Sequence, residues 1–241
     1  MIKLKIIQVY DRFARSIPKL KHIEGLTMLN HTELQLLTDA HVFDDMTDKQ
    51  IKIYTAAIEV FAEKGYLNAS TKEIAAKADV AEGNIFSKFT NKRGLLNAII
   101  EPVAKSIFPE TLSSFTDSEP IPKDLSLHEF VDSLVKDRMD FLEDNQDVLK
   151  IFISEMVYDD QVRQQYLSKF PDAYWHTIND NLNLLKATHK MVNWDNWEIM
   201  QIMWSLIGGM VISFIFFHIQ PTDKAVNHAV AALVKALNPR L

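Results

Sequence analysis

Apolar side chains follow a helical period from residue 47 onward. Tyr54, Ile58 and Phe61 are separated by four and three residues, the spacing that places side chains on one face of an α-helix. Thr47 and Gln50 form a capping-box pattern at the start of this run. The alternating pattern typical of strands is weak throughout, so the sequence predicts an all-α chain.

Three shorter helices are predicted directly after the first one, which ends at Gly65. A second capping box, Ser70–Glu73, opens a short helix that ends in a turn at 79–81. A third helix covers about 82–88, and Asn91 is a suitable cap for a fourth. Two short helices joined by a tight turn indicate a helix-turn-helix, whose second helix enters the DNA major groove.

Residues 109–123 are rich in Pro, Ser and Thr and are predicted to form a loop, after which larger helices follow. Pro102 lies inside the fourth helical pattern and predicts a kink or an early stop there. The pattern predicts helices at 125–144, 146–158, 160–187 with a break at Pro171, 194–219 and 223–237. The expected architecture is a small N-terminal three-helix unit followed by a larger C-terminal helical bundle.

The predicted domains are an N-terminal extension at 1–46, the helix-turn-helix domain at 47–106 and the helical bundle at 107–241. The extension is expected to be poorly ordered, because its helix signal is modest at 31–43 and absent before that. Met28 and Met46 are alternative starts, so part of this segment could be untranslated. The other interpretation is an arm that touches DNA through its basic residues. These are Lys3, Lys5, Arg12, Arg15, Lys19 and Lys21.

The charge distribution is compatible with DNA binding, and the composition excludes several other classes of protein. The formal net charge is -6, yet residues 48–105 carry nine basic and seven acidic side chains, and the acid is concentrated in 106–241. A local basic face is enough for phosphate contact. The chain has no cysteine, which excludes disulfides and thiolate zinc sites and fits a cytoplasmic location. It contains no Gly-rich phosphate loop, nucleophile elbow or HExxH pattern, so we expect no enzyme activity, no cofactor and no metal.

The residues of three motifs support a helix-turn-helix more strongly than the spacing of the helices alone does. They are Thr71–Ala75, Val80–Phe89 and Asn91–Leu96, preceded by Gly65 and Tyr66. Together they closely resemble the N-terminal domain of the TetR/AcrR family over about 60 residues. The C-terminal part resembles that family only in the number and order of its helices. The resemblance implies an all-α fold with an N-terminal three-helix helix-turn-helix DNA-binding domain, followed by a C-terminal helical bundle for ligand binding and dimerisation.

The resemblance implies a set of DNA-contacting positions. Thr71 and Lys92 are expected at phosphates, Asn84 at base edges, and Gly83 where the backbone comes close to DNA. The expected DNA-binding residues are Thr71, Lys72, Ala81, Glu82, Gly83, Asn84, Phe86, Ser87, Lys88, Asn91 and Lys92.

The chain departs from the family pattern at four of these positions. Phe86 stands where the family usually has Tyr, so a hydroxyl contact to phosphate is lost, and Lys88 is a candidate replacement. The family often has Thr at Asn84, Tyr or His at Lys88, and Ser at Ala81, and an alanine cannot cap the third helix. The alternative interpretations are that Phe86 is a core residue and that Lys88, Lys92 and Arg93 form a solvated face.

The apolar stretch 199–219 is long enough to span a bilayer. A membrane-anchored helical interaction protein is therefore the alternative, but no Lys or Arg cluster flanks the stretch, so a helix buried in a subunit interface is favoured. The expected dimer-interface residues are Leu206, Gly208, Gly209, Val211, Phe214, Val226, Val230 and Leu233.

The C-terminal aromatic residues are expected mostly in the core, and some of them could line an apolar ligand pocket. The candidates for such a pocket are Phe130, Phe152, Met156 and Trp175. Glu155 lies in an apolar stretch and is either a paired or solvent-facing acid or a site for a cationic ligand. Asp159 and Asp160 are interpreted as a helix cap rather than an acid–base pair.

The sequence thus predicts a homodimeric, sequence-specific DNA-binding transcriptional repressor. Its partners are expected to be a palindromic double-stranded operator and an unidentified small apolar effector that releases it. No membrane partner is expected.

Overall fold

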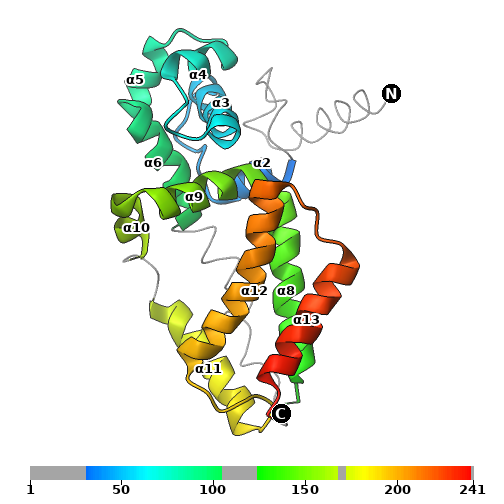
Figure 1. Ribbon diagram of the computed structural model, residues 1–241. Coiled ribbons are helices and arrows are strands. Elements are labelled where there is room, and N and C mark those ends of the chain that lie inside the picture. Colours follow the sequence, from blue (N-terminus) through cyan, green and yellow to red (C-terminus); the bar gives the residue numbers. More distant parts are fainter. Residues whose placement is uncertain (1–30, 105–123, 168–171, 240–241) are drawn as a thin grey trace. The chain divides into compact units, whose positions relative to one another are not determined.

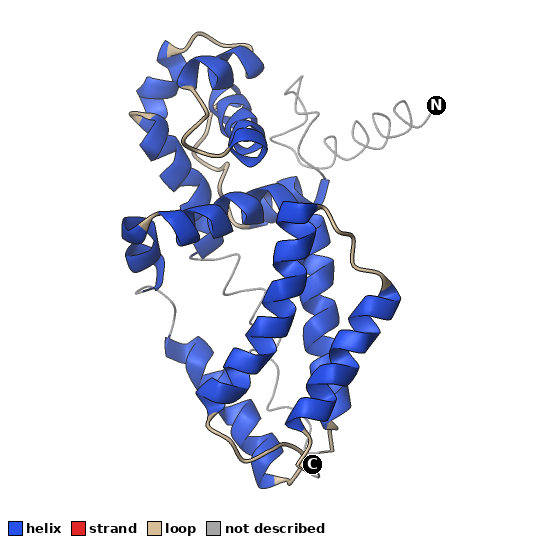
Figure 2. Cartoon of the chain, in the orientation of Figure 1, coloured by secondary structure: helices blue, strands red, loops and turns tan. Residues whose placement is uncertain are grey.

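The computed structural model describes residues 31–104, 124–167 and 172–239 (Figure 1). All regular structure in these ranges is helical (Figure 2), so the all-α prediction is confirmed. The helices are α2 (His31–Asp39), α3 (Asp48–Lys64), α4 (Thr71–Lys77), α5 (Gly83–Phe89), α6 (Lys92–Pro102), α8 (Leu127–Asp144), α9 (Gln146–Tyr158), α10 (Asp160–Leu167), α11 (Asp172–Ala187), α12 (Asn196–Phe217) and α13 (Asp223–Leu237).

Side-chain caps set the starts of the helices in the predicted DNA-binding segment. Thr47 accepts from the backbone of Gln50, and the Gln50 side chain accepts in return from the backbone of Thr47. The Asn91 side chain caps α6 by accepting from Gly94 N at 2.8 Å. Since these caps are local, the sequence located the corresponding helix starts correctly.

Two helix ends in this segment depend on glycine or proline. Gly65 follows α3 with a φ of 76°, a backbone conformation that favours glycine. In α6, a Cβ atom added at Gly94 would lie 1.9 Å from the Phe89 carbonyl oxygen, so only glycine fits where α6 meets the end of α5. The α-helical part of α6 ends at Pro102, and the backbone continues as π-helix at 103–104, so the predicted alternatives of a kink or an early stop stay open.

The chain divides into two compact units. One comprises Met1–Ile107 with Asp144–Lys169, and the other comprises Phe108–Glu143 with Phe170–Leu241. This division differs from the predicted boundary at residue 107, because α9 and α10 belong to the first unit. The apolar side chains of Val148, Leu149 and Ile151 on α9 are buried, and α9 packs against α3 and α6.

The core of the first unit forms around α3, which packs against α4, α5, α6 and α9. Ile51 and Ile58 are fully buried, as the predicted periodicity requires. The Tyr54 hydroxyl donates to the Ala98 carbonyl at 3.2 Å and connects α3 to α6.

Residues 31–46 are part of this core, in contrast to the poorly ordered extension expected at 1–46. Leu34, Leu37 and Phe43 are buried, and the Phe43 ring meets Tyr54 edge-on at a centroid distance of 5.7 Å. The modest sequence signal did not reveal this because the segment is stabilised by contacts with distant helices. Residues 1–30, with the candidate basic arm and Met28, lie outside the described residues.

The second unit contains α8, α11, α12 and α13. In it α12 packs against both α11 and α13. The predicted break at Pro171 lies outside the described residues, and α10 and α11 are separate helices on either side of it. Helix α12 is long and apolar enough to cross a membrane, and one third of its most apolar window is buried in the protomer.

Candidate nucleic-acid interface

The helix-turn-helix is formed by α4, the turn at 78–82 and α5. Ile74 and Ala75 on α4, and Ile85 and Phe89 on α5, are buried and hold the two helices against α3. Ile85 and Phe89 therefore have the core positions expected from their spacing. The opposite side of α5 is left for contact with a partner.

Phe86 lies on that outer side and is 47% exposed, so its alternative interpretation as a core residue is wrong. Gly83 is also exposed, and a Cβ atom added there would meet nothing within 4 Å. The protomer's own packing does not require glycine at this position. Ala81 is exposed, and α5 begins without a side-chain cap, as expected.

Several predicted DNA-contacting side chains are already engaged within the protomer. The Thr71 hydroxyl donates to Glu82 Oε1 at 2.6 Å, and the Ser87 hydroxyl donates to the Asn84 carbonyl at 2.8 Å. Lys88 is exposed, and its ammonium lies 3.3 Å from the Asp45 carbonyl oxygen. These contacts are local or solvent-exposed, so DNA can compete for the same side chains.

Lys92 is held more firmly. Its ammonium donates to the carbonyl oxygens of Tyr66 and Ala69, both at 2.8 Å, and lies 4.4 Å from the centroid of the Tyr66 ring. It thereby connects the start of α6 to the segment between α3 and α4. Lys92 thus has internal contacts within the protomer, and its predicted contact with a phosphate stays a prediction.

Arg93 connects α6 to α9 and α10, a link the sequence analysis did not identify. Its guanidinium lies 2.7 Å from Asp159 Oδ2 and 4.0 Å from Glu155 Oε2. Asp159 also caps α10 by accepting from the backbone amides of Gln161 and Val162, which confirms its interpretation as a cap. Glu155 is buried and paired, as the first alternative proposed.

These contacts shift the two carboxyl groups in opposite directions. The hydrogen bond from Arg93 lowers the pKa of Asp159. Burial raises the pKa of Glu155, although the nearby Arg93 charge opposes that shift. The cluster is therefore an ion-pair junction with one firmly ionised acid.

Glu33 is a second position that the sequence analysis missed. Its Oε1 accepts from the backbone amides of Asp147 and Val148 at 2.9 and 3.0 Å, and so caps α9, whose own Asn145 makes no side-chain cap. Burial, reinforced by the charge of Asp147, raises the Glu33 pKa from 4.5 to about 7, while the two amides oppose this. Nothing in the local sequence indicates this contact, because the partners are more than 110 residues apart.

The eight predicted dimer-interface residues do not share one environment. Phe214, Val230 and Leu233 are 7%, 2% and 1% exposed, so they are already buried within the protomer, and their place in a dimer interface stays a prediction. Helix packing between α12 and α13 uses this face. Gly208 and Gly209 remain on an open side, where an added Cβ would meet nothing within 4 Å. Leu206, Val211 and Val226 are half-buried.

The four candidate pocket residues are divided between the two units. Phe152 and Met156 lie on α9 in the first unit, whereas Phe130 and Trp175 lie on α8 and α11 in the second. Phe130 and Phe152 are buried, and Trp175 packs against Trp204 at a centroid distance of 5.5 Å. Their grouping into one ligand pocket stays a prediction.

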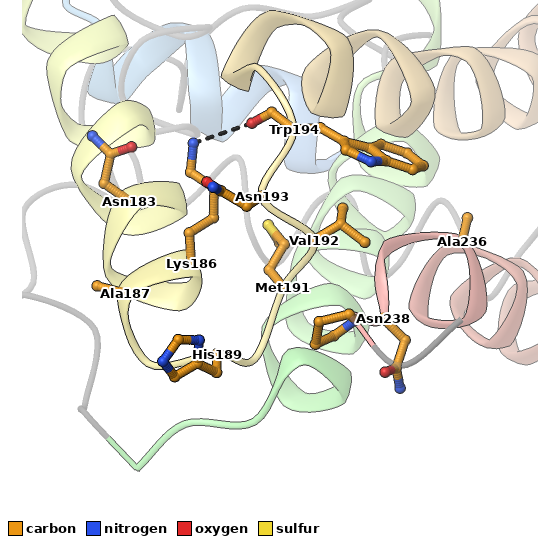
Figure 3. Close-up of a pocket in the computed structure, with 11 residues that line it drawn as sticks. Asn183, Lys186, Ala187, His189, Met191, Val192, Asn193, Trp194, Ala236 and Asn238 are labelled. Carbon is orange, nitrogen blue, oxygen red and sulfur yellow. Dashed lines mark hydrogen bonds between the residues drawn. The ribbon is translucent and has the colours of Figure 1, made fainter.

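A hollow in the second unit lies where the end of α11 and the following loop approach the end of α13 (Figure 3). Its volume is about 1020 Å³, and its lining includes Asn183, His189, Met191 and Asn238. Lys186 also lines this hollow, and its ammonium donates to the Trp194 carbonyl at 3.2 Å (Figure 3). None of the four predicted pocket residues lines it.

Comparison with known proteins agrees with this geometry. Residues 53–99 match the family model described as bacterial regulatory proteins, tetR family. The chain is 27% identical to YvkB, an HTH-type transcriptional regulator of Bacillus subtilis (strain 168). The alignment covers 78% of this chain and 96% of YvkB.

Two solved structures share the fold at low sequence identity. One is a bacterial regulatory protein in the tetR family from Rhodococcus RHA1, with a TM-score of 0.60 and 18% identity over 80% of this chain and 98% of that one. The other is the transcriptional regulator FadR from Bacillus subtilis in complex with stearoyl-CoA, with a TM-score of 0.55 and 18% identity over 76% of this chain and 97% of that one.

Proposed function

We propose that this chain, which belongs to the tetR family of bacterial regulatory proteins, is a homodimeric repressor that a small apolar ligand releases from a palindromic operator. As a member of that family it is a DNA-binding transcriptional regulator and not an enzyme. A protein that binds an operator acts where the DNA is, so we also propose a cytoplasmic location.

The observation that carries the DNA-binding part is the outer side of α5. It presents Phe86 and Lys88 to solvent, and Gly83 leaves the backbone open at the start of the helix. An exposed aromatic side chain and an unfilled glycine position contribute little to the protomer's stability. Both suit a helix that approaches the major groove closely.

Selection of binding sites from a random duplex library tests this proposal. A two-fold dimer should enrich a pseudo-palindrome with half-sites about one helical turn apart, roughly 34 Å, or a multiple of that distance. The matched variant is Asn84→Ala, which should change the preference at one or two base positions. A library from which no palindrome is enriched would count against a dimeric repressor.

The dimer is proposed to form along α12. This helix is apolar on all sides, yet Trp204, Ile212 and Phe217 are 41%, 38% and 68% exposed in the protomer. Large apolar side chains left exposed on such a helix are typical of a subunit interface. It also accounts for the apolar character of α12 without a membrane span, and the family match does not favour the membrane-anchored alternative.

Gly209→Trp is a clean test of that interface. The protomer offers open space at Gly209, so the variant should fold, while the indole should prevent the close approach of a second α12. We expect monomers by sedimentation and at least tenfold weaker operator binding. Asp137→Trp, at an exposed position of α8, is the control for adding an indole elsewhere. A Gly209→Trp protein that stays dimeric and binds tightly would exclude this interface.

The effector is proposed to be an apolar molecule, and a long-chain acyl thioester is the first class to try. FadR from Bacillus subtilis was solved with stearoyl-CoA, and its fold resembles this one. All four tryptophans lie in the second unit, so their fluorescence reports binding there. Acyl-CoA esters, aromatic drugs and quaternary cations should be screened in this way, and each ligand then added to the operator complex.

Release requires that the ligand bind the DNA-free state more tightly than the DNA-bound state. A coupling free energy of about 3 kcal/mol weakens operator binding roughly 150-fold. If every ligand that binds the second unit leaves operator affinity unchanged, the ligand-release part of the proposal fails and DNA binding stands alone.

A further inference from the structure

Glu82 is an exposed acid at the junction of α4 and α5. It directly precedes α5, on the side of the helix-turn-helix that carries Gly83 and Phe86. The Thr71 hydroxyl donates to its Oε1 atom at 2.6 Å, so one carboxylate oxygen is held in place while the other stays open to a further donor. An acid in this position needs a physical reason, because the phosphates of DNA repel it.

Three lysines of the helix-turn-helix segment and its neighbouring helices are paired with groups other than Glu82. Lys64 is paired with Glu73, and Lys77 is paired with Glu59 at 2.7 Å. The Lys92 ammonium is bound to two backbone carbonyls. Among the described residues, the Thr71 hydroxyl donates a hydrogen bond to the Glu82 carboxylate.

The base edges of the major groove offer one good partner for such a group. A carboxylate only accepts hydrogen bonds, and the groove presents donors at cytosine N4 and adenine N6. Adenine places the N7 acceptor beside its donor, which suits the mixed donor and acceptor of an amide side chain. Cytosine presents its amino donor without an acceptor of its own beside it, and so suits a carboxylate.

We propose that Glu82 is a specificity-determining residue that accepts a hydrogen bond from cytosine N4 in each operator half-site, with Thr71 as the positioning residue that orients its carboxylate. This inference rests on the proposed function, because it takes α5 as the helix that enters the major groove. Without a cytosine at that position, the carboxylate stays unpaired close to the phosphates. The penalty for the wrong base is therefore larger than the loss of one hydrogen bond.

The test is binding-site selection with the wild-type chain and with Glu82→Gln, from the same random duplex library. The wild type should show one cytosine per half-site that is preferred about tenfold over other bases. Glu82→Gln, whose amide both donates and accepts, should lose that preference and favour adenine at the same position. The other positions of the palindrome should not change.

Two further variants separate base reading from other roles. Glu73→Gln removes an acid from α4 that is paired with Lys64, and should leave every base preference unchanged. Thr71→Val keeps the shape of the side chain but loses the hydroxyl, and should weaken the cytosine preference without a switch to adenine. Glu82 is exposed, so its variant should melt at the wild-type temperature by circular dichroism.

The outcomes are distinguishable. A Glu82→Gln protein that selects the wild-type palindrome overturns the inference and leaves the proposed function intact. A variant that binds all sequences more tightly by the same factor also overturns it, because Glu82 then acts only through its charge. A wild-type chain that selects no palindrome removes the proposed function, and this inference falls with it.

Discussion

Replacing Lys92 with methionine tests whether this lysine stabilises the DNA-binding unit or contacts phosphate. Methionine keeps the unbranched stem beside the Tyr66 ring and removes the ammonium. The change deletes two hydrogen bonds from a charged donor, both at 2.8 Å, and one cation–π contact at 4.4 Å. The carbonyls of Tyr66 and Ala69 also lose their donor.

The expected loss can be worked from these contacts. A hydrogen bond from a charged group contributes about 1.5–3 kcal/mol, and an exposed cation–π contact contributes about 0.5–1 kcal/mol. Lys92 is half-buried, so water replaces part of what is lost, and we expect the free energy of unfolding to fall by about 2 kcal/mol. For a chain of this size, that lowers Tm by roughly 4–8 °C.

Two assays on the same protein distinguish the alternatives. Thermal unfolding measures the structural role. The salt dependence of operator affinity measures phosphate contacts, because each contact adds about 0.9 to the slope of log affinity against log salt concentration. Lys72→Met is the control, because Lys72 is exposed and should lower the slope by about 0.9 with an unchanged Tm. A Lys92→Met protein with an unchanged Tm and a slope lowered by about 0.9 would refute the structural role. Lys92 would then leave the two carbonyls when DNA binds.

Two other predictions concern the ends of α9. The raised pKa of Glu33 means that folding favours its protonated form, so its contribution to stability is full below pH 4.5 and is lost as the pH rises through about 7. Glu33→Gln should therefore match the wild type near pH 5 and exceed its free energy of unfolding by up to roughly 3 kcal/mol at pH 8, as measured by urea denaturation. Equal pH profiles for the two proteins would contradict this. At the other end, a double-mutant cycle with Arg93→Gln and Asp159→Asn should give a coupling of about 0.5–1 kcal/mol, because the two side chains are 33% and 27% exposed. A coupling of zero would make the ion pair incidental.

The sequence predicted the DNA-binding helices well because their boundaries depend on local chemistry. Thr47, Ser70 and Asn91 cap helices through amides three residues away, and such contacts can be read from spacing. The segment at 31–46 depends instead on distant contacts. Phe43 packs against Tyr54, and Glu33 accepts from the amides of Asp147 and Val148, so no local pattern reports how the segment is held.

The candidate site was predicted in its residue types but not in the direction of its side chains. Lys92 reads as a free cation in the sequence, and only the fold shows that two carbonyls lie within its reach. Phe214 and Gly209 both lie on α12. Phe214 is buried in the protomer, whereas Gly209 has open space beside it. A helix that is apolar on all sides gives no periodicity from which its two faces could be distinguished.

The placement of α9 changes how a ligand could act on DNA binding under the proposed function. Glu33 holds its first turn, and Arg93 holds its end through Asp159, while its middle packs against α3. All three contacts lie within the first unit, so α9 is fixed to the DNA-binding helices rather than free to slide past them. A ligand that displaces α9 must either carry α6 with it or break the Arg93 pair. The first route moves the start of α6, which directly follows the end of α5. The second costs about the coupling energy of the ion pair, so a variant without that pair should respond more weakly to any ligand that works through α9.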